Sequence, residues 1–262
     1  MRNLRLDIAY DGAGFYGWQK QPDKPTIQGL IEAAVERVTG IRSVVTGAGR
    51  TDAGVHATGQ VANFVTTAPI PAGNLCRALN NILPPEIRIM KASDAPEGFH
   101  ARRSASAKVY RYRILQAQIC PPMMARFVCH FPAQLDVQGM AEAASWLEGV
   151  HDFTSFAGAT QNAVAAGPKA GASAIRHIYH SRISPAKSLP MLTYEVRGSG
   201  FLYHMVRNIA GTLIEVGQGN FRPDDIPRIL AAQDRSKAGP TAPAEGLCLV
   251  RVEYLKPGEQ SP

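Results

Sequence analysis

The sequence contains no apolar run of the roughly eighteen residues that a membrane-spanning helix requires. Its four cysteines, Cys76, Cys120, Cys129 and Cys248, are scattered along the chain, which is typical of reduced thiols rather than of a disulfide framework. Charged residues interrupt the first seven positions, so these positions predict a strand and not a signal peptide. We therefore expect a cytoplasmic globular protein that does not enter a membrane.

The chain also lacks any repeat of solenoid length, and its 262 residues suffice for two modest domains or one large one. Alternating apolar residues predict a strand over 4–10, and apolar residues at helical spacing predict a helix that Thr26 caps and Gly40 ends. Further strands are expected at 43–46, 61–66, 87–92, 108–115, 175–183, 192–196 and 247–254. Further helices are expected at 75–80, at 137–147 with Gly149 closing it, and around 206–214 with one apolar face. Strands and helices mixed along both halves predict an α+β or α/β sandwich.

Positive charge exceeds negative charge along the chain. The formal net charge is +7 and the sequence pI is about 9.4, which favours a polyanionic partner. Arginines and lysines gather between 102 and 113, with Tyr110 and Tyr112 among them. Because phosphates attract cations and bases stack on rings, this segment indicates RNA.

A glycine pattern at 12–17 matches the dinucleotide-binding fingerprint and follows a predicted strand. That fingerprint requires a helix to open directly after it, because the first helical amides bind the pyrophosphate. Here the next helix begins only near Thr26, so the match is interpreted as false. We expect instead a glycine-rich turn that exposes Phe15, Tyr16 and Trp18.

Metal ligation is poorly supported as well. Cys120, Cys129 and His130 lack the close paired spacing of zinc ligands, and no zinc-deaminase signature is present. His177 and His180 lie within one predicted strand and would point to opposite faces. We therefore expect no metal site.

The segment 46–59 is the strongest candidate for chemistry. It follows a predicted strand, and its glycines surround Arg50, Thr51, Asp52 and His56. Glycines permit a loop to wrap closely around a ligand, and a nearby arginine favours an ionised aspartate. A plain turn in which Asp52 caps backbone amides explains the same residues equally well.

Sequence blocks distributed along nearly the whole chain resemble one family. They are YDGAGFYGWQ at 10–19, GAGRTDAGVHATGQV at 47–61, FHAR at 99–102, YRY at 110–112, DFTSF at 152–156, FLYHMVRN at 201–208 and AEGL at 244–247. In this order they resemble the tRNA pseudouridine synthase A family. The resemblance implies an isomerase that converts uridine to pseudouridine at positions 38, 39 and 40 of the tRNA anticodon arm, without a cofactor or metal.

The family's fold, carried over to this chain, is α+β: two similar halves, 1–105 and 106–262, with antiparallel sheets joined into one large sheet, helices packed on it and a cleft between the halves. The resemblance further implies a homodimer that binds tRNA across both subunits. One departure from the family pattern is the Ala- and Gly-rich segment 161–173, which is expected to be a mobile loop at the rim of the cleft.

The resemblance also assigns roles to single residues. Asp52 matches the catalytic aspartate, Arg50 an arginine that holds the flipped-out nucleotide, and Tyr110 a tyrosine that stacks on the target base. Arg207 matches an arginine that pairs with the aspartate. The remaining residues that we expect to line the substrate site are His56, Phe201 and His204. Two rival interpretations are an idle RNA-binding protein on the same fold and a nucleotide-dependent enzyme built on the turn at 12–17.

Overall fold

The computed structural model describes residues 1–158, 173–187 and 189–255. Two compact units divide the chain: the first comprises Met1–Lys108 and the chain from Cys248 onward, and the second comprises Val109–Leu247. The segment 161–173, expected to be a mobile loop, lies outside the described residues except for Ser173.

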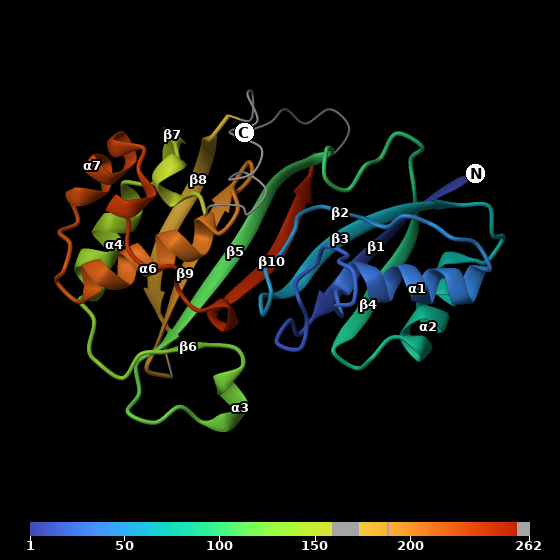
Figure 1. The fold of residues 1–262 in the computed structure, drawn as a ribbon, viewed down its shortest axis with the longest axis horizontal. Coiled ribbons are helices and arrows are strands. Elements are labelled where there is room, and N and C mark those ends of the chain that lie inside the picture. The colour runs from blue at the N-terminus through green and yellow to red at the C-terminus, as the bar shows by residue number, and fades with distance from the viewer. Residues whose placement is uncertain (159–172, 188, 256–262) are drawn as a thin grey trace. The chain divides into compact units, whose positions relative to one another are not determined.

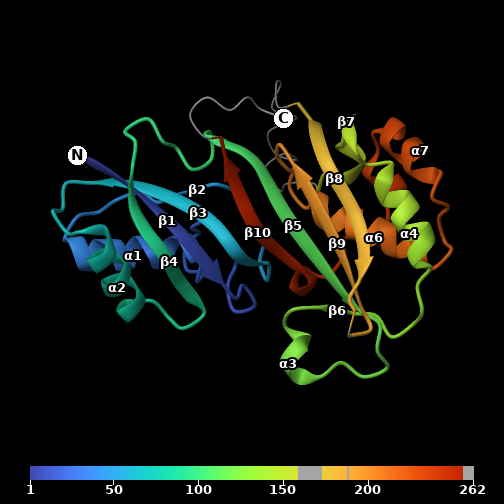
Figure 2. The same ribbon diagram turned by 180° about the vertical axis from the view of Figure 1, so that it is seen from behind.

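The first unit is a mostly antiparallel sheet with two helices packed on it. Its strands are β1 (Arg2–Tyr10), β2 (Thr46–Gly47), β3 (His56–Thr66), β4 (Ile87–Ala95) and β10 (Leu247–Tyr254), and its helices are α1 (Ile27–Thr39) and α2 (Ala72–Ile82). The strand order is β4-β1-β3-β10, with β2 also paired to β3. β1 runs antiparallel to both its neighbours, whereas β10 runs parallel to β3. Both helices lie over one face of the sheet (Figure 1), and the strands are seen from their other face in Figure 2.

The predicted strand at the N-terminus and the predicted helix after it are confirmed. Leu4, Leu6 and Ile8 alternate into the core of the first unit, as a half-buried strand requires. The Thr26 hydroxyl accepts a hydrogen bond from the Gly29 amide at the start of α1, and Gly40 ends the helix with φ +71°.

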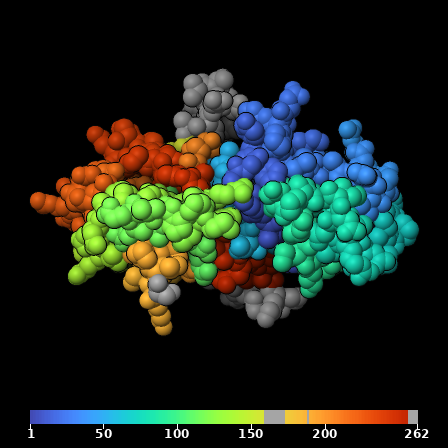
Figure 3. All heavy atoms as spheres, turned by 90° about the horizontal axis from the view of Figure 1, so that it is seen from below, coloured from blue at the N-terminus to red at the C-terminus, as the bar shows by residue number. Residues whose placement is uncertain are grey.

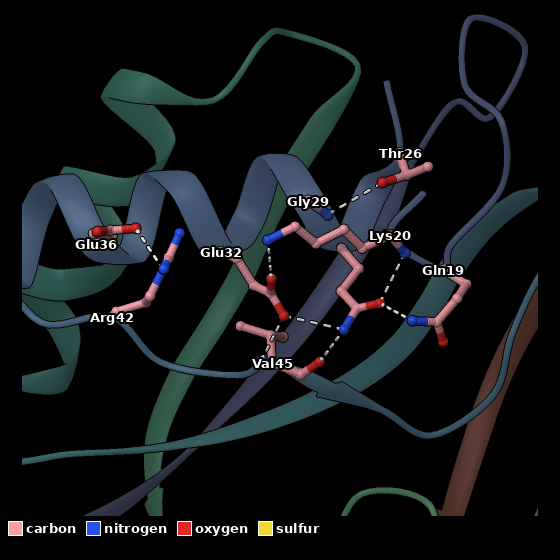
Figure 4. Close-up of polar contacts among 9 residues, drawn as sticks. Gln19, Lys20, Thr26, Gly29, Glu32, Glu36, Arg42 and Val45 are labelled. Atoms are coloured by element: carbon pink, nitrogen blue, oxygen red, sulfur yellow. Dashed lines mark hydrogen bonds and ion pairs between the residues drawn. The ribbon is translucent and has the colours of Figure 1, made fainter. Parts of the chain in front are cut away.

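The predicted strand at 43–46 is wrong in most of its length, because only Thr46 and Gly47 pair as a strand. Instead, side chains of α1 form hydrogen bonds with the backbone amide and carbonyl of Val45. Glu32 accepts a hydrogen bond from the Val45 amide at 3.1 Å, and the Gln28 amide group donates to the Val45 carbonyl at 3.0 Å. Figure 4 shows Glu32 and Val45 in this contact, beside the Lys20–Glu32 ion pair.

The second unit is also a mostly antiparallel sheet with helices on it. Its strands are β5 (Ala105–Leu115), which begins in the first unit, β6 (Cys129–His130), β7 (Gly149–Asp152), β8 (Ile175–Pro185) and β9 (Met191–Gly198). The helices are α3 (Pro122–Ala125), α4 (Val137–Ser145), α6 (Met205–Gly217) and α7 (Asp225–Ala232), with short 3-10 helices at Thr154–Phe156, Arg235–Lys237 and Ala244–Gly246. The strand order is β5-β9-β8-β7, with β6 paired to β5.

Two helix predictions in this unit need correction. α4 ends at Ser145, and Gly149 adopts φ +105° at the start of β7 instead of closing the helix. α6 buries the predicted apolar residues but is buried more widely than on one apolar face, because along it only Arg207 and Glu215 are partly exposed. A helix buried on nearly all sides packs against partners all round, and α4 and the segment at Pro240 supply two of these contacts.

Each unit therefore combines antiparallel strands with packed helices, which confirms the mixed α+β class. The segment around α3, in green, lies on the surface seen in Figure 3. Its side chains Ile119 and Met123 are exposed. Across the described residues, no helix is long and apolar enough to cross a membrane.

Candidate active site

Asp52 lies in the loop between β2 and β3, within the first unit. The loop turns tightly after it, because the Val55 amide donates to the Asp52 carbonyl at 3.1 Å and Gly54 adopts φ +80°. Arg50 is exposed, Thr51 is buried and Asp52 is half-buried. The loop thus presents a partly desolvated carboxylate two residues from a solvent-exposed cation.

A second loop, residues 12–18, packs against the backbone of the Asp52 loop. The Trp18 amide donates to the Thr51 carbonyl at 3.0 Å, and the Gly54 amide donates to the Phe15 carbonyl at 3.3 Å. Gly17 has φ +81°, and a Cβ atom there would lie 2.6 Å from the Thr51 carbonyl oxygen. Only glycine permits both this conformation and this close approach.

The expectation that the turn at 12–17 exposes three aromatic rings is correct for Tyr16 and wrong for Trp18. Tyr16 is 50% exposed, Phe15 is half-buried and Trp18 is 2% exposed. The Trp18 ring is buried because it packs over Gly47, where a Cβ atom would lie 2.5 Å from the indole. As predicted, helix α1 begins only at Ile27, so no helix opens directly after these glycines.

His56 follows the Asp52 loop as the first residue of β3, and its side chain is buried. Its Nδ1 atom lies 3.0 Å from the Gly12 amide nitrogen, which donates to it, and 3.2 Å from a carboxylate oxygen of Asp11. Hence His56 links the start of β3 to the loop at 12–18.

Three residues around this loop received no role from the sequence. They are Tyr10 at the end of β1, Gln60 in β3 and Thr51 itself; all three are buried polar side chains, and the Tyr10 hydroxyl contacts both of the others. The alternation of apolar residues marked Tyr10 as a core position, but nothing local in the sequence shows which polar group its hydroxyl contacts.

In the second unit, Tyr110 of β5 is 6% exposed and its ring packs edge to face against Phe201. Gly198 makes room for this pair, because a Cβ atom there would lie 3.3 Å from the Phe201 ring. Arg111 and Arg113 are exposed on the other side of the strand. The cations and rings that interleave along this segment therefore lie on opposite faces of the strand.

The start of α6 carries two further candidates. His204 precedes the helix with φ +58°, a conformation that non-glycine residues rarely adopt. Its ring stacks on that of Tyr203 with centroids 3.8 Å apart. Arg207 donates through Nε to the Ala242 carbonyl at 2.8 Å, and the Ala242 amide donates back to the Arg207 carbonyl at 3.1 Å.

Buried Asn208, next to Arg207, anchors this end of the helix. Its side-chain Oδ1 atom accepts hydrogen bonds from Thr241 at 2.6 Å and from Arg235 at 3.1 Å, and its side-chain Nδ2 atom donates to the Phe156 carbonyl at 2.8 Å. Because buried polar groups are costly to leave unsatisfied, this network holds the neighbouring Arg207 backbone in one position.

The structure brings the candidates together in two groups. Arg50, Asp52 and His56 belong to the first unit, and the second unit contains Tyr110, Phe201, His204 and Arg207. Within the part of the chain that is described, no three His, Cys, Asp or Glu side chains are arranged to hold a metal ion.

Comparisons with known proteins place these residues in a family. A sequence profile described as tRNA pseudouridine synthase matches residues 8–102 and 143–255, which include both groups except Tyr110. A tRNA pseudouridine synthase A of Moorella thermoacetica is 45% identical over 255 residues, covering 96% of this chain and 99% of the relative. Another, of Solibacter usitatus, is 47% identical over 254 residues, covering 97% of this chain and 100% of the relative.

Similarity to solved structures is much weaker. A chain in the crystal structure of a Cbf5-Nop10-Gar1 complex aligns with 81% of this chain and 54% of its own length, with a TM-score of 0.30 and 12% identity. The sequence relatives extend over nearly the whole length of both proteins. On that ground the chain belongs to the tRNA pseudouridine synthase family.

Proposed function

We propose that this chain converts uridine to pseudouridine at positions 38, 39 and 40 of the tRNA anticodon arm, with Asp52 as the catalytic carboxylate. Membership of the tRNA pseudouridine synthase family supports the reaction. The setting of Asp52 supports its role, because a half-buried carboxylate follows an exposed arginine in a loop whose backbone is braced by a second loop. Such a carboxylate is held in place before the substrate arrives.

The reaction itself explains why one carboxylate can suffice. The bond between N1 and C1′ breaks, the uracil turns, and a bond between C5 and C1′ forms. C5 loses a proton and N1 gains one, so the nucleoside keeps its composition and its oxidation state. No redox step or group transfer occurs, and we therefore expect no cofactor or metal. Asp52 acts either as a nucleophile or as the base that removes the C2′ proton, and both roles use its ionised form.

The proposal divides the remaining roles between residues 1–105, which carry the Asp52 loop, and residues 106–262. Arg50 holds the backbone of a nucleotide that has flipped out of its stack. Tyr110 stacks on the target base, with its ring plane supported by Phe201. Arg207 is the cation that pairs with the catalytic carboxylate.

Two histidines complete the proposed substrate site. His204 is held in a left-handed conformation at the start of α6, so its ring leaves the chain in a direction that an ordinary residue would not give it. His56 contributes from the interior, where its ring is buried against the loop at 12–18.

We propose tRNA as the partner, a homodimer as the working form with one tRNA reaching across both subunits, and the cytoplasm as the place of action. The formal charge of +7 suits a polyanion. Affinity for tRNA should then fall as salt rises, because each phosphate contact releases counterions. Light scattering of the purified protein, alone and with tRNA, tests the stoichiometry.

The decisive experiment incubates the purified protein with an unmodified tRNA transcript, without any added cofactor, and maps pseudouridine along the RNA. We expect modification at positions 38, 39 and 40. A matched transcript with cytidines at these three positions should bind equally well and stay unmodified. Binding of the first transcript without any pseudouridine would instead favour the idle RNA-binding protein.

A further inference from the structure

We propose that the Tyr10 hydroxyl is a positioning group for the catalytic loop, and that Tyr10 and Gln60 together fix where Asp52 is presented. This inference rests on the proposed role of Asp52. Tyr10 and Gln60 lie inside the first unit, so neither is proposed to touch the substrate.

Tyr10 and Gln60 form hydrogen bonds to the two residues that flank Arg50 in the loop. The Tyr10 hydroxyl oxygen lies 2.8 Å from the Thr51 hydroxyl oxygen. The side-chain nitrogen of Gln60 lies 2.9 Å from the Gly49 carbonyl oxygen and 3.4 Å from the Tyr10 hydroxyl. Side chains of two adjacent strands, β1 and β3, therefore hold the loop at Gly49 and Thr51, the residues on either side of Arg50. Thr51 directly precedes Asp52.

Hydrogen-bond chemistry fixes the orientation of Gln60 in this chain of contacts. The Gly49 carbonyl can only accept, so the Gln60 amide group must turn its nitrogen toward it. The second hydrogen on that nitrogen is then donated to the Tyr10 oxygen, and the hydroxyls of Tyr10 and Thr51 share one hydrogen bond in which either can donate. Burial raises the pKa of Tyr10, so the hydroxyl keeps its hydrogen throughout the pH range in which tRNA is handled.

The contact is buried, which increases its influence on the loop. Tyr10 is 4% exposed, Thr51 is 5% exposed and Gln60 is fully buried. Water cannot readily replace a lost partner at such a depth, and a buried polar group without a partner is costly. Removing the Tyr10 oxygen would therefore favour loop positions in which Thr51 finds another partner, and each of these moves Asp52.

The backbone restraint from the loop at 12–18 acts separately. The Trp18 amide and Gly17 confine the carbonyl side of Thr51, whereas Tyr10 confines its side chain. Loss of the Tyr10 hydroxyl should thus shift the Asp52 carboxylate by a small distance, while the loop as a whole stays in place. In enzymes, a displacement of about 1 Å can cost up to roughly 100-fold in rate.

The test measures single-turnover pseudouridine formation at saturating tRNA, together with tRNA affinity and stability to urea. Tyr10→Phe should lower the rate constant on the order of 10- to 100-fold, with tRNA affinity within about twofold of that of the unmodified protein. Thr51→Val should match it, and the double variant should lose little more, because both changes remove the same Tyr10–Thr51 hydrogen bond. Thr51→Ser keeps the hydroxyl and should restore most of the rate.

Tyr194→Phe is the matched control. Tyr194 and Ser181 form an equally buried pair of hydroxyls, 3.0 Å apart, in strands β9 and β8, where no candidate site residue lies. Loss of the Tyr194 hydroxyl should reduce the stability to urea about as much as Tyr10→Phe does, and it should leave the rate constant of pseudouridine formation unchanged. Equal rates in the two variants, or an effect of Tyr10→Phe confined to tRNA affinity, would overturn the positioning role.

Failure of the proposed function gives a different result from failure of the positioning role. If Asp52→Asn remains active, or if the unmodified protein forms no pseudouridine, the proposed function is wrong. If Asp52→Asn is inactive and Tyr10→Phe turns over at the full rate, only the positioning role is wrong.

Discussion

The Tyr110 ring meets the Phe201 ring edge to face, with centroids 5.1 Å apart and ring planes at 82°. This arrangement is favourable for two aromatic rings, since the positive edge of one meets the negative face of the other. Phe201 thereby sets the plane of the Tyr110 ring, and a base that stacks on Tyr110 has to adopt that plane.

Two substitutions of Tyr110 distinguish the contribution of its ring from that of its hydroxyl. Tyr110→Phe keeps the ring, so tRNA affinity should stay nearly unchanged while turnover slows. Tyr110→Ala removes the stacking surface as well and should weaken binding by roughly 1–3 kcal/mol. Filter binding and single-turnover kinetics measure the two effects, and a large loss of affinity in Tyr110→Phe would show that the ring does not stack on the base.

Asp52→Asn changes charge without changing shape. We expect pseudouridine formation to fall below detection, because the amide can serve neither as nucleophile nor as base. Affinity for tRNA should remain, since Arg50 and the other cations are untouched. Asp23→Asn, in the exposed part of the loop before α1, keeps the same change of charge and should retain full activity.

Gly17→Ala tests the contact between the two loops. The new Cβ atom would lie 2.6 Å from the Thr51 carbonyl oxygen, in a backbone conformation with φ +81°. Strain of this kind costs roughly 1–3 kcal/mol of stability, and the displaced Thr51 backbone should slow turnover too. Gly14→Ala is the matched control, because nothing lies within 4 Å of its added Cβ atom; equal behaviour of the two variants would contradict the contact.

The free energy of unfolding should fall at alkaline pH because buried tyrosines lose their protons. Burial raises the pKa of Tyr10, Tyr112 and Tyr194 above the value of about 10 that an unfolded chain has. The folded state therefore favours the neutral phenol, and this contribution is fully present below about pH 10 and is lost as pH rises toward the folded pKa.

Urea unfolding between pH 8 and pH 11, taken with the phenolate absorbance, measures this loss. Each buried tyrosine should reduce the free energy of unfolding by about 1.4 kcal/mol per pH unit above about pH 10. Tyr194→Phe removes one titrating group and should reduce the slope accordingly. A slope that this variant leaves unchanged would assign the alkaline loss to other groups.

Local signals predicted local structure well. The helix from Ile27 to Thr39 was predicted from the Thr26 cap and the Gly40 stop, because both act within a few residues. The class of fold also followed from the spacing of apolar residues. The Asp52 loop was picked out by its glycines, but its chemistry came only from the family resemblance.

The failures share one cause, which is contact with a distant part of the chain. The burial of Trp18 depends on Gly47, and the lost strand at Val45 depends on side chains of α1. Tyr10 and Gln60 meet only because β1 pairs with β3. The opposite faces of Tyr110 and Arg111 were, in contrast, readable from strand alternation.

Strand β10 belongs to the first unit, although it follows the whole second unit in the sequence. Domains generally fold from the N-terminus during synthesis, yet β3 of the first unit pairs with β10 at Cys248 and Leu249, directly beside His56 and Ala57. The ribosome makes that strand after Val109–Leu247, the continuous second unit. All residues of the second unit are therefore synthesised before the first unit can be completed, and the strand that follows Asp52 acquires its neighbour β10 only after them.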